Sequence, residues 1–278
     1  MYLAPMSYIA ITIPAPQELR DVLVAQLSDM GYEGFEERPD ALVAFIPEGD
    51  FIENDLQGLV GSHGVDYTKE RIEQANWNAL WESSFEPVLV DDFCGIRAGF
   101  HAPLGDAVAH EIIITPKMSF GTGHHATTFS VVRLMRDVDF KGKQVFDFGS
   151  GTGILAILAD KLGAAETKGI DIDDWAVENA AENAEMNASG NVRFSRADSL
   201  SGEETGRFDV VLANINRNIL LTNMGEMKRI LKKHGILILS GILQEDEPAI
   251  VKAAQAEGLR PEKRAEREHW LALSFIAG

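Results

Sequence analysis

The stretch that decides the fold reads Val145-Phe-Asp-Phe-Gly149-Ser-Gly151-Thr-Gly153, and an apolar helical pattern follows it at once. An apolar strand that runs straight into a glycine-rich turn and then a helix is typical of nucleotide-binding α/β domains. Because the three glycines carry no Cβ, we expect the turn to let a ligand approach the backbone closely. The stretch therefore predicts a ligand site at the carboxyl end of this strand.

Strands and helices alternate around this turn. The spacing predicts strands over 144–148, 167–172, 192–195, 209–213 and 235–240, and helices over 127–137, 154–162, 175–186, 219–231 and 247–257. This alternation predicts an α/β fold, with a mostly parallel sheet covered by helices on both faces. Two strands, over 259–265 and 270–275, complete the sheet. We expect the last one to run antiparallel, because the segment before it is too short for a helical crossover.

The first quarter of the chain has a different pattern. Strand, helix, strand, strand, helix and strand are predicted over 8–13, 18–30, 34–37, 42–46, 52–60 and 67–72, with Gly61 and Gly64 ending the second helix. This order predicts a small α+β domain of the ferredoxin-like type. We therefore expect an N-terminal domain at 1–72, a linker at 73–86 and the larger domain at 87–278. Short strands at 88–90, 94–98 and 111–114 lead into the larger domain.

The charge of the chain restricts its partners. The net charge is −18, and residues 1–76 contribute −10 of it with 14 acidic and 4 basic side chains. Such a chain repels a phosphate backbone, so we expect no direct nucleic-acid partner and favour a basic protein or a cationic small molecule. There is no apolar run of the roughly 20 residues that a membrane span needs. With no export signal and Cys94 as the only cysteine, we expect a cytoplasmic protein. We also expect it to be a monomer.

Two acidic residues separate the possible nucleotide ligands. Asp147 lies two residues before Gly149, where a carboxylate would repel a pyrophosphate but attract the ammonium of a methionine moiety. Asp171 ends the next predicted strand, where its carboxylate can accept both hydroxyls of a ribose. After the third core strand, Asp198 is placed to meet the exocyclic amine of adenine. These residues favour S-adenosylmethionine over a dinucleotide, with a nicotinamide-dependent oxidoreductase as the alternative.

Other polar residues have a structural interpretation beside the functional one. Asp173 opens a helix and is expected to cap it, and Thr127 and Thr128 can cap the helix that they begin. His124 and His125 are adjacent, so their side chains diverge and we expect no metal site. Asn214 ends the fourth core strand at the ligand edge, where its carbonyl can accept a substrate N–H without adding charge.

With these residues in view, the chain resembles the bacterial methyltransferases of ribosomal large-subunit protein L11. That family has a loop like 120–128, a glycine turn like 147–153, an acid like Asp171 and an asparagine strand end like Asn214. The resemblance covers residues 77–275 well and residues 1–76 in size and pattern only. Two departures from the family sequence leave the exact make-up of the substrate pocket undecided. The family loop usually reads glycine-threonine-histidine-proline-threonine-threonine, which differs from 123–128 here, and the family's asparagine-isoleucine-leucine is Asn-Ile-Asn at 214–216.

The resemblance implies a class I methyltransferase (Rossmann-like) domain behind a small substrate-recognition domain. It implies S-adenosylmethionine as cofactor, with Thr128, Gly149, Asp171 and Asn214 as contacts. The implied substrate is a basic ribosomal protein, methylated on lysine side chains and on its α-amine. From the residues, we add Asp147, Gly151 and Asp198 to the cofactor site. We also expect Asn214 to align the amine for in-line transfer, which depends mainly on proximity.

Two other functions stay open besides the oxidoreductase. Within methyltransferases, the amine can belong to another protein, to a glutamine or to a small molecule. Outside enzymes, the same fold can serve as an adaptor that holds a basic partner on its acidic domain. The intact glycines and Asp171 favour an enzyme.

Overall fold

The computed structural model describes residues 7–38, 40–72, 86–115 and 123–278. The chain divides into two compact units between Phe85 and Glu86. The predicted linker, with Trp77 and Trp81, lies outside the described residues, as does the start of the predicted 120–128 loop.

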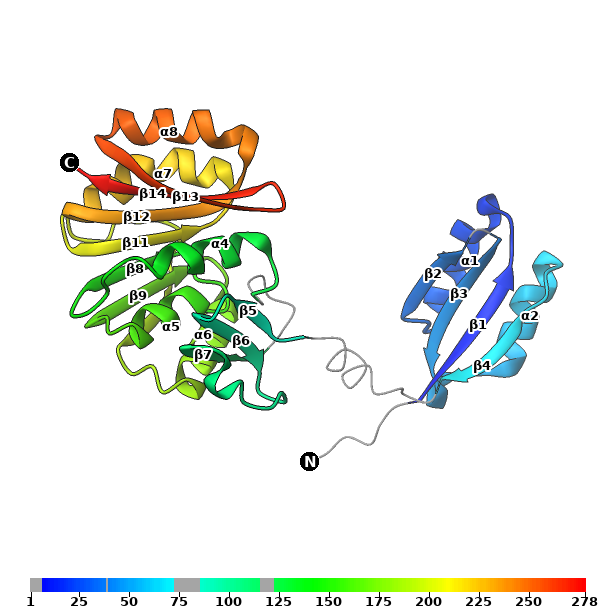
Figure 1. Ribbon diagram of the computed structural model, residues 1–278. Coiled ribbons are helices and arrows are strands. Elements are labelled where there is room, and N and C mark those ends of the chain that lie inside the picture. Colours follow the sequence, from blue (N-terminus) through cyan, green and yellow to red (C-terminus); the bar gives the residue numbers. More distant parts are fainter. Residues whose placement is uncertain (1–6, 39, 73–85, 116–122) are drawn as a thin grey trace. The chain divides into compact units, whose positions relative to one another are not determined.

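The N-terminal unit is one antiparallel sheet with two helices (Figure 1). Its strands lie in the order β2-β3-β1-β4. Apolar side chains of β1, such as Ile11 and Ile13, pack with Leu23 and Leu27 of α1 and with Leu56 of α2. The elements are β1 (Tyr8–Pro14), α1 (Gln17–Asp29), β2 (Gly34–Arg38), β3 (Ala41–Pro47), a 3₁₀ turn (Glu48–Asp50), α2 (Glu53–His63) and β4 (Thr68–Ile72). The predicted order of strands and helices is confirmed. The second helix passes through Gly61, however, and ends at Gly64, whose φ is +65°.

The C-terminal unit is built on a seven-stranded sheet in the order β10-β9-β8-β11-β12-β14-β13 (Figure 1). Strands β10 to β12 are mutually parallel, and β14 is antiparallel to both of its neighbours, as predicted from the short connection before it. The strands are β8 (Gln144–Phe148), β9 (Glu166–Asp171), β10 (Val192–Arg196), β11 (Phe208–Asn214), β12 (Leu231–Leu243), β13 (Leu259–Arg267) and β14 (Trp270–Ala277). The chain leaves β8 towards β9 on one side and later returns to β11 on the other. The carboxyl end of β8 is therefore the topological switch point, where open α/β sheets bind ligands.

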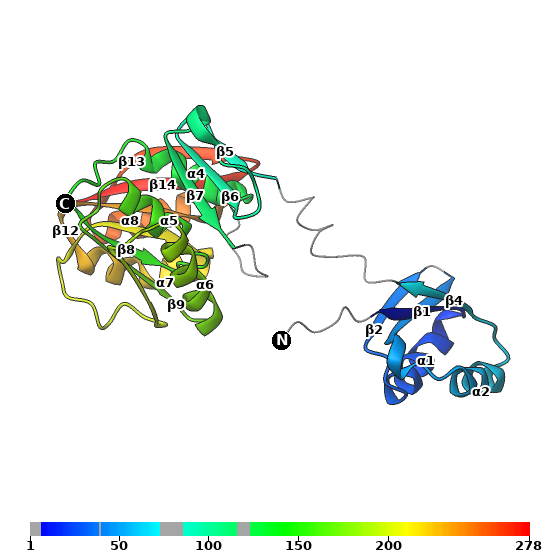
Figure 2. The same ribbon diagram turned by 90° about the horizontal axis from the view of Figure 1, so that it is seen from below.

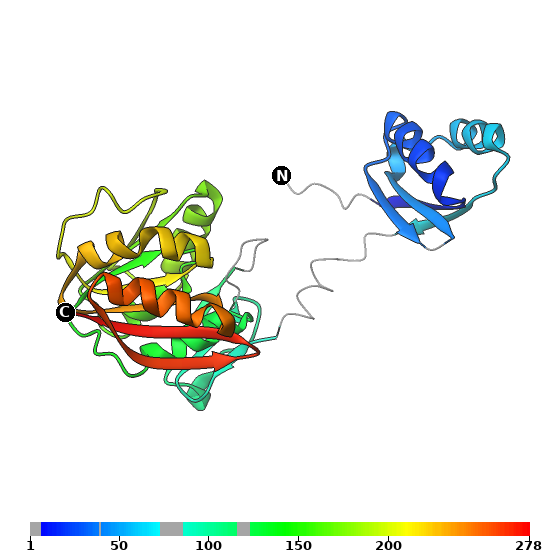
Figure 3. The same cartoon turned by 90° about the horizontal axis from the view of Figure 1, so that it is seen from above.

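Helices cover both faces of this sheet. On one face, α7 contacts β11 and β12, and α8 contacts β13 and α7. Both helices lie on the same side of the sheet, α7 in yellow and α8 in orange, as Figure 3 shows from above. On the other face lie α4, which contacts β12 to β14, and α5 and α6, which contact β8 to β10. The helices are α4 (Ala126–Met135), α5 (Ile154–Lys161), α6 (Asp174–Met186), α7 (Arg217–Ile230) and α8 (Glu247–Ala256), with a 3₁₀ turn at Gln244–Asp246. The predicted mostly parallel sheet with helices on both faces is confirmed.

A second, three-stranded sheet precedes the large one. It consists of β5 (Val88–Val90), β6 (Cys94–Ala98) and β7 (His110–Ile114), with a 3₁₀ turn at Gly105–Ala107, and it lies against α4, α5 and α6 (Figure 2). Inside it, the buried Arg97 is paired with Glu111 at 2.8 Å between Nη2 and Oε1. The three strands predicted at the entrance of the domain thus form a sheet of their own.

The hairpin between β13 and β14 turns through two residues in a left-handed conformation. Glu268 has φ +52° and His269 has φ +69°. A two-residue turn with both φ values positive matches the twist of a hairpin but is normally made by Asn-Gly. Trp270 starts β14 directly after this turn. The turn therefore fixes where the tryptophan lies relative to the rest of the sheet.

Candidate functional site

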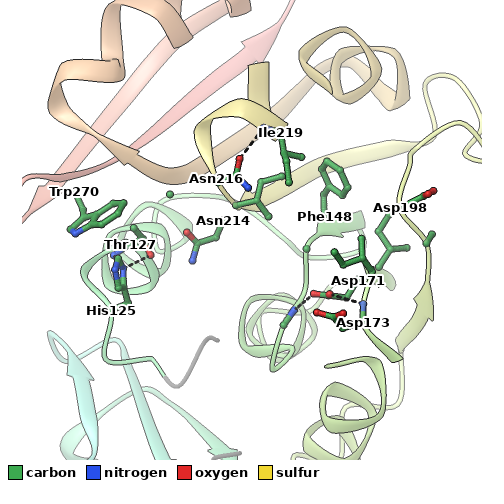
Figure 4. Close-up of a pocket in the computed structure, with 17 residues that line it drawn as sticks. His125, Thr127, Phe148, Asp171, Asp173, Asp198, Asn214, Asn216, Ile219 and Trp270 are labelled. Atoms are coloured by element: carbon green, nitrogen blue, oxygen red, sulfur yellow. Dashed lines mark hydrogen bonds between the residues drawn. The ribbon is translucent and has the colours of Figure 1, made fainter. Parts of the chain in front are cut away.

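A cavity of about 440 Å³ lies at the switch point of the large sheet (Figure 4). It is lined from β8, β9, β10 and β11, from the start of α4 and of α7, from β12 and from the first residue of β14. The lining residues are His125, Thr127, Phe148, Gly149, Gly151, Ile170, Asp171, Ile172, Asp173, Ala197, Asp198, Asn214, Ile215, Asn216, Ile219, Gly241 and Trp270. Five of the seven predicted site residues are thus brought together: Gly149, Gly151, Asp171, Asp198 and Asn214.

Hydrogen bonds to strand β9 hold the glycine turn in place. The N–H groups of Gly149 and Ser150 both donate to the carbonyl oxygen of Ile170, each at 2.9 Å. Gly149, Gly151 and Gly153 all have positive φ, which favours glycine. Gly153 does not line the cavity. A Cβ there would lie 2.7 Å from Cζ of Phe194, so this glycine makes room for packing rather than for a ligand.

Asp171 both shapes the turn and lines the cavity. Its Oδ2 accepts the N–H of Gly151 at 2.9 Å, and its Oδ1 accepts the N–H of Asp173 at 3.2 Å. Each carboxylate oxygen can accept a second hydrogen bond, so a diol can still bind to it. Asp173 stands at the predicted N-cap position of α6, but its side chain makes no capping bond. The prediction that this side chain caps the helix is therefore wrong.

Asn214 lines the cavity, and Thr128 holds its side-chain amide. Its Nδ2 donates to Oγ1 of Thr128 at 3.4 Å, which leaves Oδ1 buried and without a hydrogen-bond partner among the described residues. Thr128 itself is 2% exposed and does not line the cavity. Thr128 therefore orients the amide of Asn214, and its predicted direct contact with the cofactor stays a prediction.

Asp147 lies inside β8, paired in register with Gly169 of β9 and Leu212 of β11. It is 1% exposed, does not line the cavity, and neither of its oxygens has a hydrogen-bond partner within the described chain. Burial raises the pKa of Asp147 to about 7. The backbone N–H of Ala156, too poorly placed for a hydrogen bond, opposes this rise, and the charge of Asp171 adds to it. Any attraction between Asp147 and a cofactor ammonium must act through the turn.

The raised pKa of Asp147 predicts a pH-dependent stability. Between its ordinary pKa of 3.8 and about 7 the folded state holds a proton that the unfolded state has lost, so the free energy of unfolding falls as the pH rises through this window. At 1.36 kcal/mol per pKa unit the fall from this residue is roughly 4 kcal/mol. We expect urea unfolding without ligand to show a much smaller loss between pH 5 and pH 8 for Asp147→Asn than for the unaltered protein. All other titrating groups are common to both, so equal losses would contradict the assignment.

Two glycines leave space for Ile215, which lines the cavity next to Asn214. A Cβ on Gly149 would lie 2.3 Å from Cγ2 of Ile215, and a Cβ on Gly241 would lie 2.0 Å from its carbonyl oxygen. Gly241 has φ +90° and lies where the register between β12 and β14 shifts. Gly241 was not among the residues predicted for the site. The signal that can reveal it is a glycine that interrupts the apolar run 236–243.

His125 and Trp270 form one end of the cavity. Their ring centroids are 4.6 Å apart, with an edge-to-face angle of 69° between the planes. His125 also caps α4, because its Nδ1 accepts the N–H of Thr127 at 3.2 Å. The capping role predicted for the threonines thus belongs to the histidine. A further contact between the hairpin and α4 is the guanidinium of Arg267, which lies 4.2 Å from the ring centroid of Phe129.

The charges of the cavity are separated, as Figure 4 shows. The carboxylates of Asp171, Asp173 and Asp198 lie at the ends of β9 and β10, whereas Asn214, His125 and Trp270 lie at the opposite end. An adenosyl sulfonium fits this arrangement. Its ribose would meet Asp171, its adenine would meet Asp198 and Ile172, and its methionine part would pass over the glycine turn.

No helix in the described part of the chain is both long and apolar enough to cross a membrane.

Comparisons with known proteins give one consistent family. The model of the ribosomal protein L11 methyltransferase (PrmA) family matches residues 32–277. A ribosomal protein L11 methyltransferase of Porphyromonas gingivalis is 39% identical, over 97% of this chain and 98% of that protein. Its counterpart in Bacteroides fragilis is 38% identical, over 95% and 96%. The crystal structure of a ribosomal protein L11 methylase from Lactobacillus delbrueckii subsp. bulgaricus, 26% identical, aligns with a TM-score of 0.63 over 70% of this chain and 99% of that one.

Proposed function

The chain belongs to the family of ribosomal protein L11 methyltransferases, and from this premise we propose that it methylates lysine side chains and the α-amine of ribosomal protein L11. Family membership and fold make it a methyltransferase of the S-adenosylmethionine-dependent class. The observation that carries the choice of an amine is the neutral end of the cavity, formed by Asn214, His125 and Trp270.

The chemistry explains why a neutral end suits an amine. When bound, S-adenosylmethionine supplies a methyl group on a positively charged sulfur. A lysine must reach it with a free lone pair, and losing the proton at pH 7.5 costs roughly 4 kcal/mol for a pKa of 10.4. An apolar, neutral surrounding lowers the pKa of the amine, whereas a carboxylate beside it would raise that pKa. The three carboxylates at the other end of the cavity are therefore well placed for the cofactor and away from the amine.

Asn214 aligns the amine in this proposal. Its unpartnered Oδ1 accepts one N–H of the neutral amine, which leaves the lone pair free to point along the direction of transfer. Alignment of this kind can supply most of the rate enhancement. The indole of Trp270 packs along the methylene chain of the lysine and excludes water from it.

The N-terminal unit has the charge that a basic protein substrate requires. Its four cationic side chains are all engaged: Arg38 with Glu36, Lys69 with Glu53, Arg71 with Glu48, and the buried Arg20 with the carbonyl oxygens of Ala15 and Arg38. Among the side chains that the structure describes in this unit, seven other exposed carboxylates remain, at Asp29, Glu33, Asp40, Asp50, Asp55, Asp66 and Glu70. This surface attracts a lysine-rich protein and speeds its encounter with the enzyme.

Methyl transfer from labelled S-adenosylmethionine to whole ribosomal protein tests the proposal. We expect one protein band, that of L11, to take up label, with the modified residues located by mass spectrometry on lysine side chains and the α-amine. The same reaction with the Asn214→Ala variant is the matched control and should give little label. Label on another band would replace L11 as the substrate, and label on no band would defeat the assignment to a ribosomal protein.

A further inference from the structure

The side chain of Asn183 connects the glycine turn to the second sheet. It lies on α6, is fully buried, and makes two hydrogen bonds in opposite directions. Its Nδ2 donates to the carbonyl oxygen of Thr152 in the glycine turn at 2.8 Å. Its Oδ1 accepts the N–H of Thr115, directly after β7, at 2.8 Å.

Asn187 follows one helical turn later as the C-cap of α6, and the hydrogen bonds of its side chain within the described residues go to β7 and to its own helix. Its Oδ1 accepts the N–H of Ile113 at 2.9 Å, and its Nδ2 donates to the carbonyl oxygen of Ile113 at 2.6 Å and of Asn183 at 2.7 Å. The two amides together bond the edge of β7 as a neighbouring strand would. Only Asn183 extends this contact to the turn.

The bond from Asn183 complements the bonds that hold the turn from the other side. The N–H groups of Gly149, Ser150 and Gly151 are fixed by Ile170 and Asp171 of β9. The carbonyl oxygen of Thr152, at the far end of the turn, is fixed by α6 through Asn183. A turn with three positive-φ glycines has many accessible conformations when it is not held, because glycine restricts the backbone least.

We propose that Asn183 is a positioning residue for the cofactor: it holds the glycine turn in the conformation that binds S-adenosylmethionine. The apparent affinity of a ligand falls in proportion to the fraction of protein in the binding-competent conformation. Loss of one buried hydrogen bond, at about 1–1.5 kcal/mol, lowers the equilibrium constant between the competent turn and its other conformations about tenfold. Where these conformations are close in free energy without ligand, the competent fraction falls by nearly as much. This proposal concerns cofactor binding alone, so it stands or fails independently of the identity of the methyl acceptor.

Isothermal titration of the full chain with S-adenosylmethionine, without any methyl acceptor, tests the proposal. We expect Asn183→Ala to raise the Kd about tenfold. Asn187→Ala is the matched control, since it removes a half-buried amide and its bonds to β7 from the C-terminal end of the same helix without touching the turn. We expect it to lower the melting temperature by a similar amount and to leave the Kd within twofold of the unaltered protein.

A second variant covers the case in which Asn183→Ala does not fold. Asn183→Asp, titrated well above the pKa of its buried carboxyl so that it is ionised, keeps the acceptor for the N–H of Thr115 and lacks the donor to Thr152. We expect it also to raise the Kd about tenfold. An unchanged Kd in a folded Asn183 variant, or an equal loss of affinity in Asn187→Ala, would overturn the proposal and reduce Asn183 to a structural contact.

Discussion

Replacing Asn214 by alanine is expected to lower the kcat of methyl transfer about a hundredfold, far more than it weakens binding of the substrate protein. The amide offers an unpartnered, buried Oδ1 at the neutral end of the cavity, and its orientation is fixed by Thr128. Without it the amine loses the group that aims its lone pair, and a misplacement of about 1 Å costs on the order of 100-fold in rate. Single-turnover kinetics with labelled cofactor, alongside binding titrations, measure the two effects separately.

An asparagine outside the cavity provides the control. Asn223 lies half-buried on α7, where its Nδ2 donates to the carbonyl oxygen of Ile219. The Asn223→Ala variant should match the unaltered protein in kcat. Near-normal turnover in Asn214→Ala, or a loss confined to KM, would remove Asn214 from the catalytic step.

Replacing Gly241 by alanine is expected to be the most destabilising single change at the site. The new Cβ would lie 2.0 Å from the carbonyl oxygen and 2.7 Å from the carbonyl carbon of Ile215, at a residue whose φ is +90°. Backbone must move to relieve this overlap, and the left-handed conformation adds its own cost, for a total of about 3 kcal/mol or more. Because Asn214 and Ile215 move together, S-adenosylmethionine binding should be lost as well. Urea unfolding and isothermal titration measure the two losses.

Gly258 separates the overlap from the conformational cost. Its φ is +78°, similar to that of Gly241, but nothing lies within 4 Å of the place where its Cβ would be. Gly258→Ala should lower the free energy of unfolding by only about 1–2 kcal/mol and leave cofactor binding unchanged. Equal destabilisation by the two substitutions would mean that Ile215 yields freely to a side chain at Gly241.

The sequence predicted the large sheet well because parallel, doubly covered strands are continuous apolar runs with clear ends. The run 144–148 stands between Lys143 and Gly149, and the observed β8 has the same bounds. The antiparallel last strand followed from a short connection alone. The end of α2 was missed, because a helix can pass through Gly61 at a modest cost and stop at Gly64, where the backbone is left-handed.

The site was predicted in part, for a physical reason. Residues at strand ends, such as Asp171 and Asn214, are placed by the sheet itself, so their convergence could be foreseen. The positions of site residues that other elements contribute could not be foreseen. Trp270 reaches the cavity only because a hairpin turn and the order β12-β14-β13 bring it there. The capping role of His125 and the burial of Asp147 depend on side-chain rotamers and packing, which local pattern does not encode.

The strand order of the large sheet has a consequence for how the chain folds during synthesis. β14 lies between β12 and β13, although both of these strands precede it in the chain. When β13 has been synthesised, β14 does not yet occupy the position beside β12. The nascent chain can therefore pair β13 directly with β12, which is a non-native pairing. The insertion of β14 between them, which also delivers Trp270, must then come last. Late long-range pairing of this kind is slow and exposes strand edges to aggregation, which predicts that this domain gains its cofactor site at the final step of folding.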